Sequence, residues 1–273
     1  MTSTTVPAAK PLTVGSARIR YTTHPATGAA PGRDLVLVHG TGGGSGMWDP
    51  LVPSFTERHT VHLPDLSGSG VEDVSDDGGD LAVEQLAAEI VAVIEDAGGH
   101  PVDLLGFSLG AVAAAAAAAL RPDLVDRLVL VAGWSDPDDE YLRNMMTVWL
   151  AIADNPAAFG RYATLTAFSR DHLNTIGRDA VEANAAFMQP TPDTLRQIAL
   201  NLRLDIRHLL PRITADTLVL GCRQDATVPA ANSRALHTAI TGSAYDEFDT
   251  GHVVVYEQTE AFVTRVRAFL DRG

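Results

Sequence analysis

The sequence of 273 residues predicts an α/β domain, a mostly parallel sheet with helices on both faces. Short β-rich runs alternate with helical stretches across residues 34–132 and again across 217–271, which is the pattern of strands joined by crossover helices. Several of the β-rich runs are almost entirely aliphatic, as expected for strands that are buried on both faces. Hydrophobic residues make up 46% and charged residues 20%, which excludes a disordered or fibrous chain.

The strand candidates follow from short aliphatic or β-branched runs. We expect strands at Leu35–Val38, Thr60–Leu63, Val102–Phe107, Leu128–Val131, Thr217–Leu220 and Tyr245–Phe248. An antiparallel edge hairpin at Leu12–Val14 and Ala17–Tyr21 brings the predicted sheet to eight strands. Apolar residues at spacings of three and four predict helices at Met47–Glu57, Leu81–Ala97, Leu109–Leu120, Ala230–Ile240 and Thr259–Asp271.

The strand signal disappears between Trp134 and Pro211. This stretch reads as helices that are broken at Asn155-Pro156 and at Pro190-Thr191-Pro192. We therefore expect a helical cap, residues 135–210, inserted into one core.

The core is predicted to consist of residues 12–134 and 211–273. Residues 1–11 lack the charged start and the apolar stretch of a secretory signal. We expect these residues to form a flexible tail. The most apolar run, Leu109–Leu120, is shorter than the roughly 20 residues of a membrane span. We expect a cytoplasmic protein that does not bind membranes.

Charge and composition exclude several classes of function. The 20 Lys and Arg residues against 34 Asp and Glu residues leave a net charge of −14, which disfavours nucleic acid as a partner. Lys10, the single lysine, lies in the predicted tail, so Schiff-base enzymes are disfavoured. Cys222 is the only cysteine, and no histidine pair or His/Asp/Glu cluster has metal-ligand spacing. We expect neither a metal nor a cofactor.

The sharpest local signal is Gly106-Phe107-Ser108-Leu109-Gly110, which follows a predicted strand and opens an alanine-rich helix. A G-x-S-x-G motif in this setting presents its serine at the apex of a strained strand-to-helix turn, where Cβ atoms on the two glycines would collide with backbone. The sequence therefore predicts Ser108 as a nucleophile rather than a simple helix N-cap.

A serine nucleophile requires a base and an acid that orients the base. Asp225 follows the predicted strand Thr217–Leu220, and His252 follows Tyr245–Phe248 in a Gly-His pair. Because ligands of parallel sheets bind at the carboxyl ends of the strands, Ser108, Asp225 and His252 are expected to meet there. Asp136, with Asp138 close by, is an alternative source of the acid.

These motifs resemble the α/β-hydrolase fold of the single-domain type with a helical cap. The chain order Ser, Asp, His matches. So do the run from His39 to Gly44 after the third strand and the run from Asp65 to Gly70 after the fourth. The resemblance covers residues 15–134 and 211–271. Within the predicted cap, the resemblance is limited to the place at which the helices are inserted.

The resemblance also implies how a tetrahedral oxyanion is stabilised. The donors would be the backbone amides of Leu109 and Thr41, with Gly42 as an alternative to Thr41 because three glycines follow. His39 is expected to order the loop rather than to transfer protons. Asp65 is expected to close its own loop by accepting hydrogen bonds.

The predicted cap is rich in large apolar side chains. Residues 134–188 hold seven of the 16 aromatic residues and three of the five methionines. An apolar pocket beneath the cap is therefore expected, and it suits a bulky, uncharged substrate. The predicted pocket residues are Trp134, Met145, Trp149 and Phe187.

The sequence as a whole predicts a cofactor-free serine hydrolase that cleaves a carboxylic ester or lactone of a hydrophobic small molecule. Serine at position 108 disfavours epoxide hydrolases and haloalkane dehalogenases, which in this fold attack with a carboxylate. A thioesterase, a C–C bond hydrolase, a perhydrolase and a natural-product cyclase or lyase stay open. So does a ligand receptor with slow turnover. The excess of Ala and Arg over Lys resembles proteins of high-GC bacteria, in which such enzymes serve secondary metabolism. Oligomeric state is left open.

Overall fold

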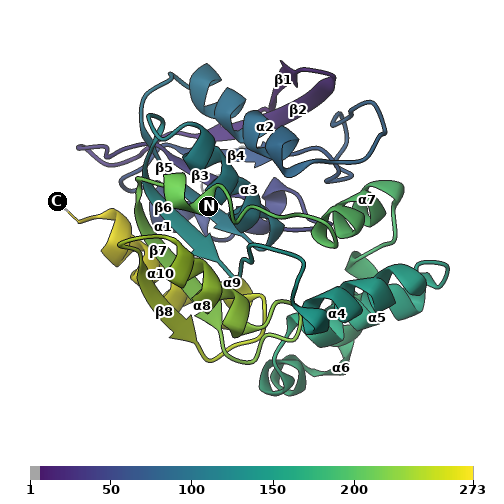
Figure 1. Ribbon diagram of the computed structural model, residues 1–273. Coiled ribbons are helices and arrows are strands. Elements are labelled where there is room, and N and C mark those ends of the chain that lie inside the picture. Colours follow the sequence, from purple (N-terminus) through teal and green to yellow (C-terminus); the bar gives the residue numbers. More distant parts are fainter. Residues whose placement is uncertain (1–6, 273) are drawn as a thin grey trace.

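A computed structural model describes residues 7–272. Its centre is a sheet of eight strands in the order β1-β2-β4-β3-β5-β6-β7-β8 (Figure 1). The strands are β1 Lys10–Val14, β2 Ala17–His24, β3 Leu35–Val38, β4 Val61–Asp65, β5 Val102–Phe107, β6 Val125–Val131, β7 Asp216–Cys222 and β8 Ala244–Phe248. The predicted fold, a mostly parallel sheet of eight strands, is confirmed.

Only the first two pairings of the sheet are antiparallel. β1 pairs with β2, and β2 with β4, in antiparallel register, whereas every pairing from β4 to β8 is parallel. The strand β1 begins at Lys10, so the last two residues of the predicted tail 1–11 belong to the sheet instead. Residues 1–6 of that tail lie outside the described part of the chain.

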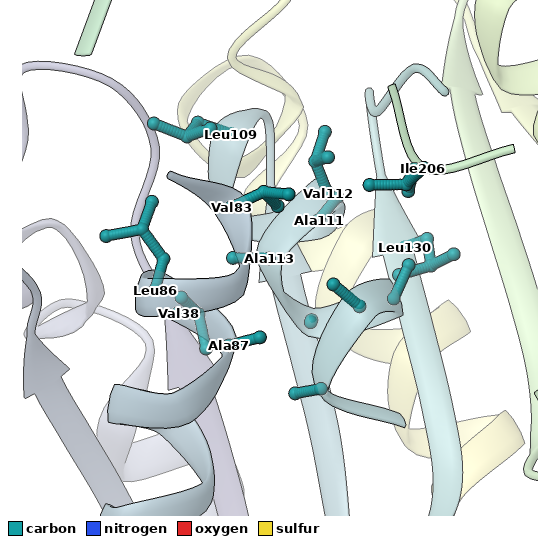
Figure 2. Packing of buried hydrophobic residues seen from close by; sticks show 14 of the residues in the cluster. Val38, Val83, Leu86, Ala87, Leu109, Ala111, Val112, Ala113, Leu130 and Ile206 are labelled. Atoms are coloured by element: carbon teal, nitrogen blue, oxygen red, sulfur yellow. The ribbon is translucent and has the colours of Figure 1, made fainter. Parts of the chain in front are cut away.

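Helices cover both faces of the sheet. On one face lie α2 Val83–Asp96, α3 Leu109–Leu120 and α8 Ala230–Ala239, and on the other α1 Val52–Phe55, α9 Val254–Glu257 and α10 Thr259–Leu270. Helix α3 is buried from Leu109 to Ala119. Its short alanine side chains let both the neighbouring helix α2 and the sheet approach it closely, as the packing in Figure 2 shows.

One predicted helix is wrong in part. The periodicity of Met47–Glu57 predicts a single helix, but the structure has the 3-10 turn η1 Ser45–Trp48 and the short helix α1. Pro50 and Pro53 lack the amide hydrogen that a continuous helix uses. The prolines therefore outweigh the apolar spacing.

Four helices lie between β6 and β7, as the sequence predicts for residues 135–210. They are α4 Glu140–Ala151, α5 Pro156–Ala167, α6 Arg170–Phe187 and α7 Pro192–Asn201, with the 3-10 turn η2 Leu210–Arg212 before β7. Asn155 and Thr191 cap α5 and α7, whose first residues are the prolines that break the helical pattern in the sequence. We call residues 135–210 the helical insertion. It gathers at one end of the sheet, at lower right in Figure 1.

No helix within residues 7–272 is long and apolar enough to cross a membrane.

Asp103 is a buried acid near the amino end of β5. Its side chain is inaccessible, and neither carboxylate oxygen has a hydrogen-bond partner among the described residues. Burial raises the pKa of Asp103 from 3.8 to about 7, although Arg127 and Arg33 act in the opposite direction. An acid with a raised folded-state pKa binds its proton more tightly in the folded state. Its destabilising effect therefore grows as the pH rises from 3.8 and is complete above about 7.

We predict that Asp103→Asn raises the melting temperature by a few degrees at pH 8 and by less at pH 5, because the substitution removes a buried ionised group. About 1 kcal/mol corresponds to about 2–4 °C in a protein near this size. Thermal unfolding followed by circular dichroism at both pH values tests this. Asp216→Asn, which changes an exposed aspartate at the start of β7, is the control and should show no such pH dependence. An Asp103→Asn gain that is equal at both pH values would contradict the assignment.

Candidate active site

Ser108 lies on a strained turn between β5 and α3. Its φ of 57° and ψ of −123° are unusual for a residue with a side chain. The turn also requires two close backbone approaches. A Cβ on Gly106 would lie 2.1 Å from the Gly110 carbonyl oxygen, and one on Gly110 would lie 2.4 Å from the His39 carbonyl oxygen. Only glycine allows α3 to start this near to β3.

The structure brings Ser108 and His252 together. The distance from Ser108 Oγ to His252 Nε2 is 2.9 Å, although 144 residues separate the two in the sequence. Both residues are buried, and the His252 ring packs against Phe107, with 4.9 Å between the ring centroids. Because each residue follows the carboxyl end of a parallel strand, the sheet itself places both at one edge.

Asp225 orients the imidazole from its other side. Its Oδ2 lies 2.7 Å from His252 Nδ1, and its Oδ1 accepts hydrogen bonds of 2.8 Å from the amides of Thr227 and Val228. A carboxylate held by two amides cannot rotate freely, so its second oxygen stays directed at His252. With Nδ1 donating to Asp225, Nε2 of His252 is left to accept the proton of Ser108.

The alternative acid, Asp136, has other partners. Its carboxylate accepts hydrogen bonds from the Ser135 hydroxyl and the Asp138 amide. Asp138 pairs with Arg207 at 2.6 Å. The acceptor of the His252 Nδ1 hydrogen bond is therefore Asp225 and not Asp136.

The loop after β3 lies beside Ser108. A Cβ on Gly40 would be 3.0 Å from the Ser108 Cβ, and Thr41 lines the same cavity as Ser108. Within residues 7–272 the amides of Thr41 and Leu109 have no backbone acceptor. The Gly42 amide, in contrast, donates to Gln197 Oε1 at 2.8 Å. Thr41 and Leu109 thus supply unpaired amides near Ser108, whereas the alternative, Gly42, is already bound. We call residues Gly40–Gly43, which include the predicted oxyanion donor Thr41, the oxyanion loop.

His39 has the loop-ordering contacts that the sequence predicts, whereas Asp65 accepts hydrogen bonds from another loop and from β2 rather than from its own loop. His39 Nε2 accepts the Leu66 amide at 3.1 Å, and its Nδ1 donates to the Gly40 carbonyl. Burial lowers the pKa of His39, so the ring is neutral and fits this pattern. Asp65 accepts from the Ser45 amide and from Arg20. Both side chains therefore connect loops at the carboxyl edge of the sheet.

A cavity of about 460 Å³ opens above Ser108. Its walls come from the core loops and from α4, α5 and α6, and among residues 7–272 no Asp, Glu, Lys or Arg side chain lines it. Helix α6 is kinked at Gly177, and both of its parts line the cavity: His172 and Ile176 lie before the kink, and Ala180, Asn184 and Phe187 lie after it. This arrangement suits an uncharged, mainly apolar ligand.

Two of the four predicted pocket residues line this cavity. Trp149 lies deep in the wall and Phe187, 77% exposed, lies at the rim. The prediction is wrong for Trp134 and Met145, which are buried in the hydrophobic core instead. On α4 the cavity side is the face of Met146 and Trp149, three residues apart, and Met145 points elsewhere. Aromatic enrichment alone does not specify a helix face.

The described residues contain no group of three or more His, Cys, Asp or Glu side chains arranged to hold a metal ion. In the acidic segment Glu72–Asp80, Asp76 is paired with Arg196 at 2.8 Å. Burial raises the pKa of Cys222 to about 12, so this thiol stays protonated.

Sequence reasoning missed the polar residues that join the helical insertion to the core. Glu257 accepts hydrogen bonds from the Ser169 amide at 2.7 Å, the Ser169 hydroxyl at 2.7 Å and the Gly251 amide at 3.1 Å. It thereby connects the start of α6 to the loop that carries His252. Gln197 and Asn201 connect α7 to the oxyanion loop. The only sequence signal for Gln197 and Asn201 is their position on the buried face of the amphipathic helix α7.

Comparison with known proteins agrees with this geometry. The model of a family described as "Alpha/beta hydrolase family" matches residues 35–265. The chain belongs to the α/β hydrolase family. Its relatives include the pyrrolizixenacetamide deacetylase of Xenorhabdus hominickii, 38% identical over 262 residues that cover 94% of this chain and 96% of the relative.

Another relative is the pimeloyl-(acyl-carrier protein) methyl ester esterase of Xanthomonas oryzae pv. oryzae, 30% identical over 75% of this chain and 81% of the relative. Among solved structures, the enol-lactonase from Burkholderia xenovorans LB400 aligns with a TM-score of 0.83 and 22% identity, over 96% of this chain and 100% of that one. The α/β hydrolase fold is thus shared along nearly the whole chain, and the protein is an α/β-hydrolase enzyme of the ester-hydrolase type.

We predict that Gly110→Ala destabilises the protein by about 3 kcal/mol or more, because the new Cβ meets backbone that cannot move without disturbing β3. The melting temperature and the yield of soluble protein report this loss. Gly46→Ala serves as the control, since its Cβ would have ordinary contacts only. A Gly110→Ala protein with the stability of Gly46→Ala would refute the close approach.

Proposed function

We propose that this α/β hydrolase is a serine hydrolase that cleaves a carboxylic ester of a hydrophobic small molecule through an acyl-enzyme on Ser108. One observation carries the proposal, the continuous hydrogen-bonded chain Ser108–His252–Asp225 at the base of an uncharged cavity. The ester-hydrolase type of the relatives supports it.

In the acylation step the Ser108 oxygen attacks the carbonyl carbon of the ester while His252 Nε2 takes the hydroxyl proton. Asp225 stabilises the imidazolium that forms. The tetrahedral intermediate then breaks its carbon–oxygen bond, and His252 returns the proton to the departing alcohol. The products of this step are the free alcohol and an acyl group on Ser108.

The amides of Thr41 and Leu109 would stabilise the negative charge of the tetrahedral intermediate. They are backbone donors beside Ser108 without another acceptor, so they need no rearrangement when charge develops. A single donor of this kind contributes about 3–4 kcal/mol to the stabilisation of the transition state. In deacylation, water attacks the acyl group, His252 accepts its proton, and the carboxylic acid leaves as Ser108 is restored.

The cavity supports a neutral substrate of small to medium size. A charged acyl or alcohol group would lose its hydration without meeting an opposite charge, because no charged side chain lines the walls. Esters and lactones with apolar groups fit best.

A second candidate function is removal of an acyl group from nitrogen. It is favoured by the 38% identity, over 94% of the chain, with a protein named as a deacetylase. The same triad would serve, with His252 protonating a departing amine instead of an alcohol. A panel of matched p-nitrophenyl esters, p-nitroanilides, thioesters and lactones ranks cleavage of these bonds directly.

We predict that Ser108→Ala lowers hydrolysis of p-nitrophenyl butyrate by about 10⁴-fold or more and abolishes covalent labelling by a fluorophosphonate, because both need the serine oxygen. Ser16→Ala, which changes an exposed serine, is the control and should behave as wild type. Undiminished turnover by Ser108→Ala would overturn the acyl-enzyme and favour a lyase or cyclase. A wild-type protein that stops after one turnover would favour the receptor.

We also predict that Phe187→Ala reduces the preference for longer esters about fivefold, since roughly 1 kcal/mol of apolar contact at the rim is lost. The value of kcat/KM for a series from acetate to octanoate is the measurement. Leu165→Ala removes another exposed apolar residue, one that does not line the cavity, and should leave the preference unchanged. An equal loss for every chain length would contradict the placement of Phe187.

A further inference from the structure

Gln197, from α7 of the helical insertion, is a buried amide that joins two core loops. Its side chain is 1% exposed. Its Oε1 accepts the Gly42 amide at 2.8 Å, and its Nε2 donates to the Ser67 carbonyl at 3.1 Å. Ser67 is itself fixed, because its amide and hydroxyl donate to the buried carboxylate of Glu89 at 2.9 and 2.6 Å. The oxyanion loop is thus connected through Gln197 to a rigid part of the core.

The two loops are shaped to admit this amide. Gly42 has a φ of 65°, and a Cβ there would lie 2.7 Å from Met188 Sδ and 3.1 Å from Thr194 Cγ2, both of the insertion. A Cβ on Gly68 would lie 2.9 Å from Gln197 Cγ. Glycine at both positions therefore lets the insertion pack directly on the backbone of the core loops.

Asn201, one turn further along α7, holds the side chain of Thr41. Its Nδ2 donates to Thr41 Oγ1 at 3.0 Å, and the residue is 2% exposed. Thr41 is therefore held on two sides. Asn201 fixes its hydroxyl, and Gln197 fixes the peptide group that follows it. Little freedom is left for the direction of the Thr41 amide.

We propose that Gln197 and Asn201 are positioning residues that hold the Thr41 amide in the orientation required for oxyanion binding. The inference rests on the proposed function. An oxyanion donor must lie about 2.7–3.1 Å from the developing charge, and a misplacement of about 1 Å can cost about 100-fold in rate. The helical insertion then takes part in the reaction and does not only enclose the substrate.

The chemistry of the contacts favours a neutral amide at position 197. The side chain must accept from one partner and donate to another, and a carboxylate can only accept. In a Gln197→Glu variant, the ionised carboxylate would face the Ser67 carbonyl and add negative charge close to the oxyanion. A protonated carboxyl group, in contrast, has one acceptor and one donor and so resembles the amide.

This difference gives a test with its own pH signature. We expect Gln197→Met to lower kcat for p-nitrophenyl butyrate about 10–100-fold with KM within about twofold of wild type. Binding of a trifluoromethyl ketone that forms a tetrahedral adduct should weaken by a similar factor. Gln197→Glu should be impaired at pH 8, and its activity relative to wild type should rise as the pH falls and the carboxyl group is protonated.

Gln85→Met is the matched control. Gln85 donates to Glu89 at 3.2 Å and so touches the same network, but it makes no contact with the oxyanion loop. It should keep wild-type kcat. If Gln197→Met does not fold, the pH dependence of the activity ratio of Gln197→Glu to wild type tests the positioning role of Gln197.

Two results would overturn the proposal. One is a folded Gln197→Met with wild-type kcat and ketone affinity. The other is a Gln197→Glu to wild-type ratio that does not change with pH. Failure of the proposed function would look different, because Ser108→Ala would then retain activity whatever the behaviour of Gln197.

Discussion

The active site depends on one close backbone contact, the approach of the first turn of α3 to the end of β3. Gly110 lies against the carbonyl groups of Val38 and His39, and no side chain could be accommodated between them. This contact raises Ser108 above the sheet edge and places it beside the loop that begins at Gly40. Ser108 and the Thr41 amide are therefore positioned by the same close packing contact. Strain at Ser108 is tolerated because the surrounding core fixes it.

The elements that could be predicted from the sequence are those set by local rules. Ser108, Asp225 and His252 each follow a parallel strand, and parallel strands end at one edge, so their meeting follows from topology. The breaks at Pro156 and Pro192 likewise mark real helix starts.

The wrong predictions concern the continuity of one helix and the direction in which side chains point. Pro50 and Pro53 divide a run whose apolar spacing predicts one helix. Trp134 and Met145 belong to the core, although composition places them in the same aromatic-rich stretch as Trp149. Which face of a helix meets a cavity depends on how that helix packs, and a single sequence does not record this. Gln197 escaped notice for the same reason, since its partners lie more than 100 residues away.

The contacts of Glu257 have a practical consequence. Its carboxylate joins the start of α6 to the backbone of the loop that carries His252, and Gln197 does the same between α7 and the loop after β3. Exchange of the four helices for those of another hydrolase would remove two of the hydrogen-bond donors to Glu257 and would leave the Gly42 amide without its acceptor. An active chimaera must therefore keep the hydrogen-bonded pairs Glu257–Ser169 and Gln197–Gly42, or contain equivalent pairs. Alteration of the inward face of α6 alone is the more economical route to a new selectivity.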